Sequence, residues 1–299
     1  MLRMATGWAV LAASVLCIVS VSCQDNGQKA AELKPLINGT LPSGQRFRAA
    51  STSVDTAAFL GVLSTGPLSQ AQSNATAQTG ILKLGLSTSS RDGYIFVPNS
   101  YNSSRTNSMI LAIHAAGKGG LDALGVLIDQ ANSSGIILLA PDSRGATWDA
   151  LPAQDGAFGP DIAFISAALA QAFAQYNVNA DTLGIQGFSD GATYALGLGM
   201  TNGKLFAKVM ANSPGGVIAE RVQGMPPIFM SAGLQDDIFP INQAGNPTAC
   251  YLKSVGYNVT YIQFTGKHEV PPQIANDTIQ WYQGNFREAG SFPSGICSA

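Results

Sequence analysis

The stretch Gly187-Phe188-Ser189-Asp190-Gly191 constrains the fold of this chain more than any other. Residues 181–186 before it have the apolar pattern of a short strand, and residues 192–198 after it have that of a buried helix. The pattern G-x-S-x-G needs this strand–turn–helix setting when its serine is a nucleophile. The two glycines are then required, because so sharp a turn leaves almost no space for side chains two residues before and after the serine.

Ser189 is therefore the candidate nucleophile, although the motif alone is a weak signal in a chain with 33 glycines. The turn lifts its hydroxyl clear of the sheet and places the backbone N–H of Asp190 at a helix N-terminus, where that group can face a developing oxyanion. Two roles stay open for the Asp190 side chain. It turns away and caps the helix, or it adjusts the charge of the site.

A serine hydroxyl needs a base to accept its proton, and the chain has only 2 histidines. His268 follows the last predicted strand, where a loop can reach the nucleophile turn, and we predict that it is the base. We interpret His114 as a structural residue. The base in turn needs a carboxylate to fix its tautomer, and Asp236 and Asp237 follow another predicted strand.

From about residue 80 onward, short apolar strands alternate with helical patterns. Continuous apolar strands joined by helical crossovers are typical of an α/β fold, a mostly parallel sheet with helices on both faces. Asp161 is the predicted N-cap of its helix. The predicted strands span residues 81–86, 93–98, 109–113, 136–140, 183–186, 209–212, 228–232 and 259–264, and the predicted helices span residues 121–132, 161–176, 192–200, 246–255 and 272–286.

Four segments resemble the phospholipase/carboxylesterase branch of the α/β-hydrolases, including its relatives near the polyester depolymerases. The resemblance runs from about residue 80 to residue 286 and leaves the N-terminal part uncovered. It implies the α/β-hydrolase fold. The segments are Gly-Phe-Ser-Asp-Gly-Ala at 187–192, Gly-x-x-Asp-x-x-x-Pro at 233–240, Gly-Lys-His-Glu-Val-Pro-Pro at 266–272, and Ala-Pro-Asp-Ser-Arg-Gly with Thr-Trp-Asp at 140–149.

The resemblance also implies the roles of individual residues. The family's acid falls on Asp236, four positions before Pro240, and not on Asp237. The catalytic triad is then Ser189, Asp236 and His268, in the chain order expected of this fold.

The family's oxyanion donors fall on the backbone N–H groups of Asp190 and Ala116. The family usually has glycine directly after the histidine of this loop, whereas this chain has Ala115. Because the donor is a main-chain group, we expect the oxyanion hole to survive with a slightly altered loop. Trp148 either lines an acyl pocket or packs the loop around it.

These residues predict a serine esterase that hydrolyses carboxylic esters through an acyl-enzyme, with no metal or cofactor. The segment from Ser213 to Pro227 leaves no room for a large lid, so we expect an open pocket for short or soluble esters. A polyester depolymerase or a lysophospholipase-type enzyme is the alternative, with a small-molecule or polymer ester as the partner. A more remote alternative is a catalytically silent surface glycoprotein that keeps the fold.

The N-terminus and the composition predict export. Residues 1–23 have the short apolar run and small-residue end of a secretory signal peptide; a lipid anchor at Cys23 is the alternative. A net charge of −2 without a basic stripe argues against nucleic acid as a partner, and no other stretch has the length of a transmembrane helix. Residues 24–79 are predicted to be a low-complexity lead-in, and residues 80–299 the catalytic domain.

Export would place two further features in context. Removal of the signal peptide takes Cys17, and also Cys23 if cleavage follows it, which leaves Cys250 and Cys297 to pair in an oxidising compartment. Six sequons of the form N-x-[ST] are candidate glycosylation sites. Their asparagines are Asn38, Asn74, Asn102, Asn132, Asn258 and Asn276.

Overall fold

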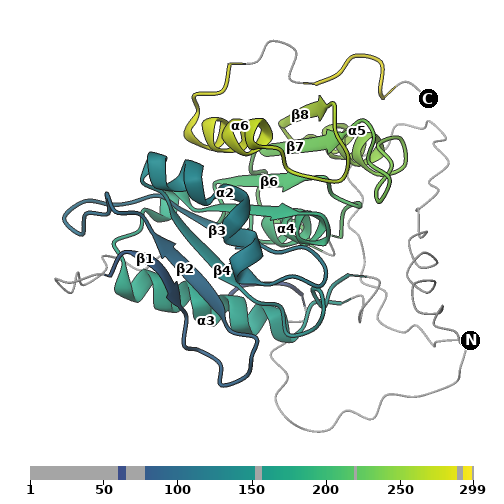
Figure 1. Ribbon diagram of the computed structural model, residues 1–299. Helices are drawn as coiled ribbons and strands as arrows, with labels where there is room; N and C mark the ends of the chain where they lie inside the picture. Colours follow the sequence, from purple (N-terminus) through teal and green to yellow (C-terminus); the bar gives the residue numbers. More distant parts are fainter. Residues whose placement is uncertain (1–59, 65–77, 152–156, 219–220, 288–291, 298–299) are drawn as a thin grey trace, which may run out of the picture. The chain divides into compact units, whose positions relative to one another are not determined.

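The computed structural model describes residues 60–64, 78–151, 157–218, 221–287 and 292–297. Within these residues the chain forms one sheet with the strand order β1-β2-β4-β3-β5-β6-β7-β8 (Figure 1). The strands are β1 (Gly80–Lys83), β2 (Gly93–Val97), β3 (Met109–Ile113), β4 (Ile137–Pro141), β5 (Gly184–Phe188), β6 (Lys208–Asn212), β7 (Ile228–Gly233) and β8 (Val259–Phe264).

The sheet is mostly parallel. β2 pairs antiparallel with both β1 and β4, and every pair from β4 to β8 is parallel. All residues of β3, β4 and β7 are buried, as expected of parallel strands that are covered on both faces. The carboxyl ends of β3, β5, β7 and β8 therefore meet at one edge of the sheet, which we call the carboxyl edge.

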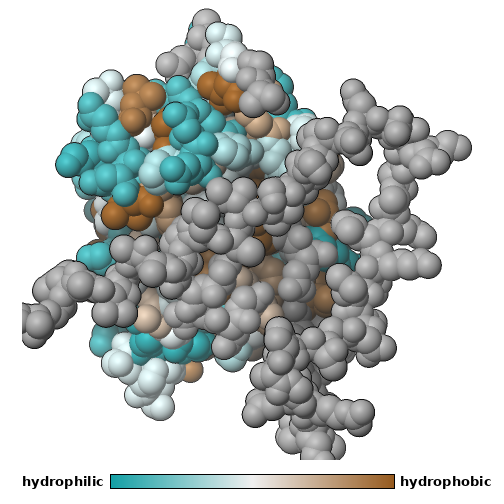
Figure 2. Space-filling model, turned by 90° about the vertical axis from the view of Figure 1, so that its right-hand side faces the viewer, coloured by the Kyte–Doolittle hydropathy of each residue, from teal (hydrophilic) through white to brown (hydrophobic). Residues whose placement is uncertain are grey.

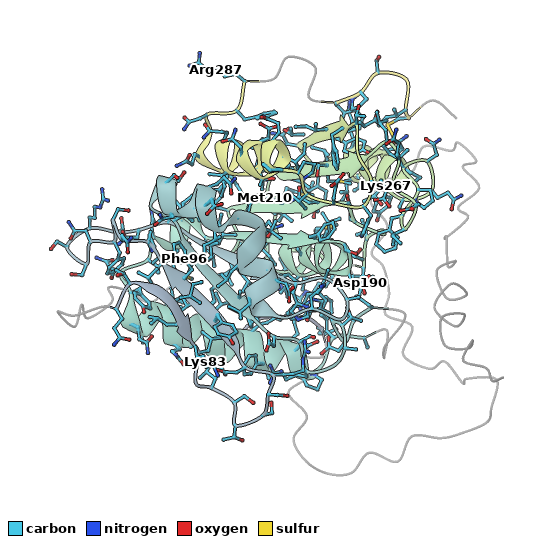
Figure 3. All side chains as sticks on the ribbon, in the orientation of Figure 1. Lys83, Phe96, Asp190, Met210, Lys267 and Arg287 are labelled. Atoms are coloured by element: carbon cyan, nitrogen blue, oxygen red, sulfur yellow. A yellow bond between two sulfur atoms is a disulfide. The ribbon has the colours of Figure 1, made fainter. Side chains whose placement is uncertain are left out.

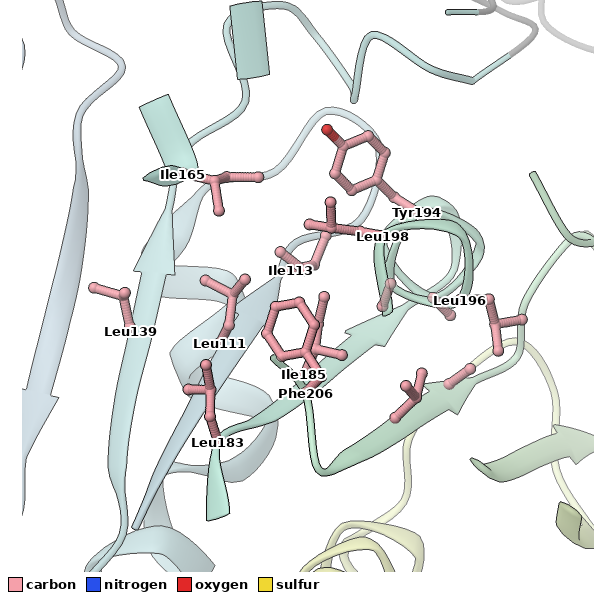
Figure 4. Packing of buried hydrophobic residues seen from close by; sticks show 14 of the residues in the cluster. Leu111, Ile113, Leu139, Ile165, Leu183, Ile185, Tyr194, Leu196, Leu198 and Phe206 are labelled. Carbon is pink, nitrogen blue, oxygen red and sulfur yellow. The ribbon is translucent and has the colours of Figure 1, made fainter. Parts of the chain in front are cut away.

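Helices cover both faces (Figure 1). α2 (Gly120–Ser134) and α6 (Pro272–Gln283) pack on one face through a core that includes Leu127 and Ile279. α3 (Pro160–Gln175), α4 (Asp190–Thr201) and α5 (Gly245–Ser254) pack on the other. Figure 4 shows this second core, where Ile165 and Leu198 from the helices meet Leu111 and Ile185 from the sheet. Burying each such side chain stabilises the fold by about 1.5–3 kcal/mol.

The predicted fold class is confirmed, and every predicted strand and helix is present with ends shifted by at most a few residues. The predicted N-cap of α3 is wrong. The N-cap is Gly159, because Pro160 occupies the first turn and starts the helix earlier. Asp161 lies inside α3 and is buried, and its carboxylate accepts hydrogen bonds from the backbone N–H groups of Arg144 and Asp149.

Residues 60–64 pack against this domain, although the sequence placed them in the lead-in. Leu63 is buried, and its N–H donates to Oδ1 of Asn202 at 2.9 Å. Nδ2 of Asn202 returns a bond of 2.8 Å to the carbonyl of Gly61. The ordered domain thus starts before residue 80. The predicted signal peptide, Cys23, Asn38, Asn74 and most of the lead-in lie outside the described residues.

The predicted disulfide between Cys250 and Cys297 is present, with the two Cα atoms 5.4 Å apart. Cys250 lies inside α5 and does not start it. The bond ties the segment 292–297 to the domain, where the Phe292 ring also packs against Tyr261, with 6.1 Å between the ring centroids. Nζ of Lys253 lies over the Phe292 ring as well, 4.1 Å from its centroid. The C-terminal segment is therefore held by a covalent bond and an aromatic contact.

The turn from β5 to α4 carries Ser189 in a strained conformation, with φ 59° and ψ −127°. A positive φ is rare for a residue with a side chain. The turn is tight because a Cβ on Gly187 would lie 2.0 Å from the carbonyl oxygen of Gly191, and a Cβ on Gly191 would lie 2.3 Å from that of Ile113. Both glycines of the motif are thus required by backbone contacts.

We expect Gly191→Ala to lower the free energy of unfolding by about 1–3 kcal/mol, or to prevent folding, because its new methyl group would overlap backbone atoms that cannot move independently. Gly216→Ala is the matched control, since nothing lies within 4 Å of the Cβ position there. Urea unfolding measures both variants. Equal stability of the two would contradict the proposed packing of the turn.

Candidate active site

The three residues of the predicted triad form one hydrogen-bonded chain. Nε2 of His268 lies 2.8 Å from Oγ of Ser189, and Nδ1 lies 2.7 Å from Oδ2 of Asp236. Because an ionised carboxylate only accepts hydrogen bonds, Nδ1 carries the proton and Nε2 accepts from the serine hydroxyl. This is the tautomer that a general base needs.

The acid is fixed by its own loop. Oδ1 of Asp236 accepts hydrogen bonds from the backbone N–H groups of Ile238 and Phe239, at 3.0 and 2.7 Å. The side chain is 1% exposed, so its charge is held in one geometry and away from water. Asp237 is exposed, and the carboxylate that bonds Nδ1 of His268 is that of Asp236. The structure therefore places Asp236, and not Asp237, against the base.

Two aromatic rings hold the imidazole. The ring centroid of Phe188 lies 4.9 Å from that of His268, and the ring of Phe239 meets it edge-on at 5.2 Å. The His268 side chain is 13% exposed and Ser189 is 8% exposed. The pair is thus sheltered but reachable from outside. The sequence analysis gave neither phenylalanine a role, because both occupy variable positions of the two motifs.

The members of the triad follow three different strands, β5, β7 and β8, and meet at the carboxyl edge. Figure 3 labels Asp190 and Lys267, the chain neighbours of Ser189 and His268, at this edge. Open α/β sheets bind ligands at the carboxyl ends of their strands. The fold therefore brings together residues that are up to 79 positions apart in the sequence.

The two predicted oxyanion donors are the backbone N–H groups of Asp190 and Ala116. Among the described residues, none accepts a hydrogen bond from the N–H of Asp190 or of Ala116. Asp190 begins α4, so the helix dipole adds to its donor strength. Ala116 is exposed in the loop that follows β3. Ala115 is accommodated there without a positive φ.

Buried side chains hold the loop of Ala116. Nε2 of His114 accepts the N–H of Ser143 at 2.9 Å, and the carbonyl of His114 accepts the indole N–H of Trp148 at 2.8 Å. Burial lowers the pKa of His114, which keeps its ring neutral and able to accept. The structure therefore shows His114 in the structural role that we predicted for it.

Trp148 is fully buried, between the rings of His114 and Tyr194. It does not line a pocket, so the prediction of a substrate contact is wrong and the packing alternative is correct. The indole is large enough to fill the space under the loop, which leaves no face for a ligand. Its N–H fixes the loop that carries Ala116.

A pair of buried carboxylates anchors the segment that carries Trp148. The N–H of Asp149 donates to Asp161 and the N–H of Asp161 donates to Asp149, at 2.8 and 2.9 Å. Burial, and next the charge of Asp161, raise the pKa of Asp149 to about 6. The sequence showed Asp149 and Asp161 only as a motif residue and a helix cap, because nothing local indicates that they pair.

The side chain of Asp190 does not cap α4, so that expectation is wrong. Instead, its Oδ2 accepts a hydrogen bond of 2.9 Å from the hydroxyl of Thr147. Burial raises the pKa of this carboxyl, whereas the Thr147 bond and the charge of His268 act in the opposite direction. The carboxylate therefore stays beside the site.

The described part of the chain contains no group of three or more His, Cys, Asp or Glu side chains arranged to hold a metal ion. Nor does any helix in these residues have the length and apolar character needed to cross a membrane.

The fold resembles those of solved esterases. Esterase PE8 has a TM-score of 0.51 and 18% identity, with 65% of this chain and 98% of that chain covered. The acetyl xylan esterase from Aspergillus awamori has a TM-score of 0.54 and 14% identity, covering 68% and 99%. The S-formylglutathione hydrolase from Staphylococcus aureus has a TM-score of 0.54 and 13% identity, with 69% of this chain and 99% of that chain covered. No protein-family model and no curated protein sequence matches the chain.

At these identities the likeness establishes the fold. The chain has the α/β-hydrolase fold, so the fold that the resemblance implied is confirmed. The part that matches includes nearly the whole length of each of these three structures.

We expect Asp236→Asn to lower kcat for ester hydrolysis by about 10³- to 10⁴-fold, because the amide would favour the wrong tautomer of His268. Asp237→Asn, its chain neighbour, is the matched control and should leave kcat nearly unchanged. Steady-state kinetics on a nitrophenyl ester measures both. A larger loss in the Asp237 variant would show that the acid is misassigned.

Proposed function

We propose that this protein is a serine carboxylic-ester hydrolase that works through an acyl-enzyme. The observation that supports this most directly is the hydrogen-bonded chain from Ser189 through His268 to Asp236. A structural serine and histidine would not need a strained turn, a buried acid and two free N–H groups at the same place. The esterases with the same fold are consistent with this activity.

In the first half-reaction, Oγ of Ser189 attacks the ester carbonyl carbon while its proton moves to Nε2 of His268. The carbonyl oxygen becomes an oxyanion, and the N–H groups of Ala116 and Asp190 stabilise it. Collapse of this intermediate breaks the carbon–oxygen bond to the alcohol, which leaves with the proton from Nε2. Asp236 stabilises the imidazolium that exists between the two proton transfers.

In the second half-reaction, a water molecule gives its proton to Nε2 of His268 and attacks the acyl carbon. The same two N–H groups bind the new oxyanion. When the intermediate collapses, the bond to Oγ breaks, Ser189 regains the proton from Nε2, and the carboxylic acid leaves. Loss of one oxyanion donor typically costs about 10²- to 10³-fold in kcat.

The region between β6 and β7 supports an open site. Its described residues, 213–218 and 221–227, form neither a helix nor a strand, so no lid element is present among them. Acetyl and formyl groups, named for two of the enzymes with this fold, are short acyl groups. We therefore propose short or soluble esters as the main substrates.

A polymer or an amphiphilic ester is a second candidate substrate, and the acid loop favours it. Leu234 and Ile238, on either side of Asp236, are 51% and 59% exposed. Figure 2, which views the molecule from the side toward which β6, β7 and β8 point, shows hydrophobic residues at the uncovered surface among hydrophilic ones. Apolar side chains beside a catalytic acid can contact an insoluble or micellar ester.

Export and glycosylation complete the proposal. The disulfide between Cys250 and Cys297 supports an oxidising compartment. The four sequon asparagines among the described residues are all exposed, as a glycan requires: Asn102, Asn132, Asn258 and Asn276.

We expect Ser189→Ala to lose several orders of magnitude in turnover while the protein stays folded. A serine-directed phosphonate should label Ser189 of the unaltered protein, and peptide mapping identifies the labelled residue. Circular dichroism of the variant is the folding control. Near-normal activity of the variant, or a label on another serine, would rule out this nucleophile.

We expect kcat/KM to fall as the acyl chain of a nitrophenyl ester lengthens from acetate upward, because the site has no lid to enclose a long chain. Leu234→Ser with Ile238→Ser should leave acetate hydrolysis nearly unchanged. If long or polymeric esters are instead preferred, and this double variant loses that preference, the second candidate substrate class is correct.

A further inference from the structure

Asp190 places an ionisable side chain directly after the nucleophile, at the end of α4 that faces the carboxyl edge (Figure 3). The Thr147 hydroxyl holds one carboxylate oxygen, Oδ2, at 2.9 Å. Oδ1 accepts no hydrogen bond from any described residue, and it is not among the buried atoms without a partner. Within the described part of the chain it is therefore unpaired, and it is not a fully buried atom. The protein orients the carboxylate through Oδ2 and leaves Oδ1 without a hydrogen bond from the described residues.

The charge of the Asp190 carboxylate acts on the base, and the base is hydrogen-bonded to Oγ of Ser189. Burial raises the pKa of Asp190, and the charge of His268 opposes that shift, so the carboxylate and the base interact. His268 in turn lies 2.8 Å from the nucleophilic Oγ. A half-buried charge is screened less than an exposed one, and its effect on neighbouring charges is larger.

The exposed charges near the carboxyl edge are weaker influences. Lys118, in the loop of Ala116, is exposed and pairs with Asp122 at 3.7 Å. Lys267 and Glu269 are exposed neighbours of opposite sign, and Asp237 is exposed. Exposed charges contribute little because water and salt screen them. The Asp236 carboxylate is buried and its oxygens accept hydrogen bonds from His268, Ile238 and Phe239.

We propose that Asp190 is a specificity-determining residue whose carboxylate selects substrates by charge. It favours esters that carry a cationic group close to the scissile bond, and it disfavours esters that carry an anionic group there. This inference rests on the proposed esterase function. It adds a class of substrate: neutral and cationic esters in preference to anionic ones.

A matched set of substrates tests the inference. One series consists of nitrophenyl esters of trimethylammonio-butyrate, of its neutral carbon isostere and of glutarate, which differ in the charge of the acyl part. A second series consists of the acetate ester of choline, its neutral carbon isostere and an acetate ester with a carboxylate in the alcohol part. Hydrolysis of this series is measured by the release of acid. The two series cover both sides of the ester. The side that shows the preference faces Asp190.

In at least one series, the kcat/KM of the unaltered protein should be about tenfold higher for the cationic member than for the anionic member. A difference of this size is expected for a partly screened charge close to the scissile bond. Asp190→Asn removes the charge but keeps an oxygen that can accept from Thr147, and it should reduce this ratio to near one. Asp237→Asn removes the same charge from the exposed acid loop and should preserve the ratio. High salt should reduce the ratio in the unaltered protein only in part.

The outcomes separate the two proposals. Hydrolysis of the neutral esters with no charge preference in either series would overturn this inference and leave the esterase function standing. A ratio that Asp190→Asn leaves unchanged, or that Asp237→Asn reduces equally, would also overturn it. No hydrolysis of any of these esters would overturn the esterase function, and the inference with it.

Discussion

The structure depends on one tight turn between β5 and α4. Ser189 adopts a positive φ there, and the carbonyl groups of Gly191 and Ile113 occupy the space that side chains at Gly187 and Gly191 would need. The strain is tolerated because the parallel strands on either side of β5 fix its end. This one constraint places Ser189 at the end of β5 and starts α4 directly after it, so that the N–H of Asp190 lies in the first turn of that helix.

The loop that carries Ala116 depends on a second layer of buried polar groups. Trp148 donates to the carbonyl of His114, and the backbone N–H groups of Asp149 and Asp161 each donate to the carboxylate of the other residue. Each group alone would be costly to bury, and the mutual hydrogen bonds offset that cost. A catalytic N–H must be fixed to within a fraction of an ångström to stabilise charge effectively. Residues that never touch a substrate therefore contribute to the geometry of the site.

The site combines three carboxylates in different states. Asp236 is buried and hydrogen-bonded to His268, Asp149 is buried and has a pKa raised to about 6, and Asp190 is half-buried, with one oxygen that accepts no hydrogen bond from any described residue. Their environments, and not their residue type, decide their roles. The first accepts a hydrogen bond from His268, the second supports a loop, and the third directly follows Ser189 and accepts a hydrogen bond from Thr147. That difference is the physical basis for assigning charge selection to Asp190.

The sequence by itself determined the elements that have local signals. Apolar runs marked the strands, and the glycines of the turn marked Ser189. The scarcity of histidine reduced the base to two candidates, of which the position after the last predicted strand selected His268. Only the tertiary structure decided the pairings between distant elements, such as Trp148 with His114, and the direction of the Asp190 side chain toward Thr147. Helix and strand periodicities report which face is buried, but they carry no information about which buried polar groups meet. That choice is made by packing, after the elements have formed.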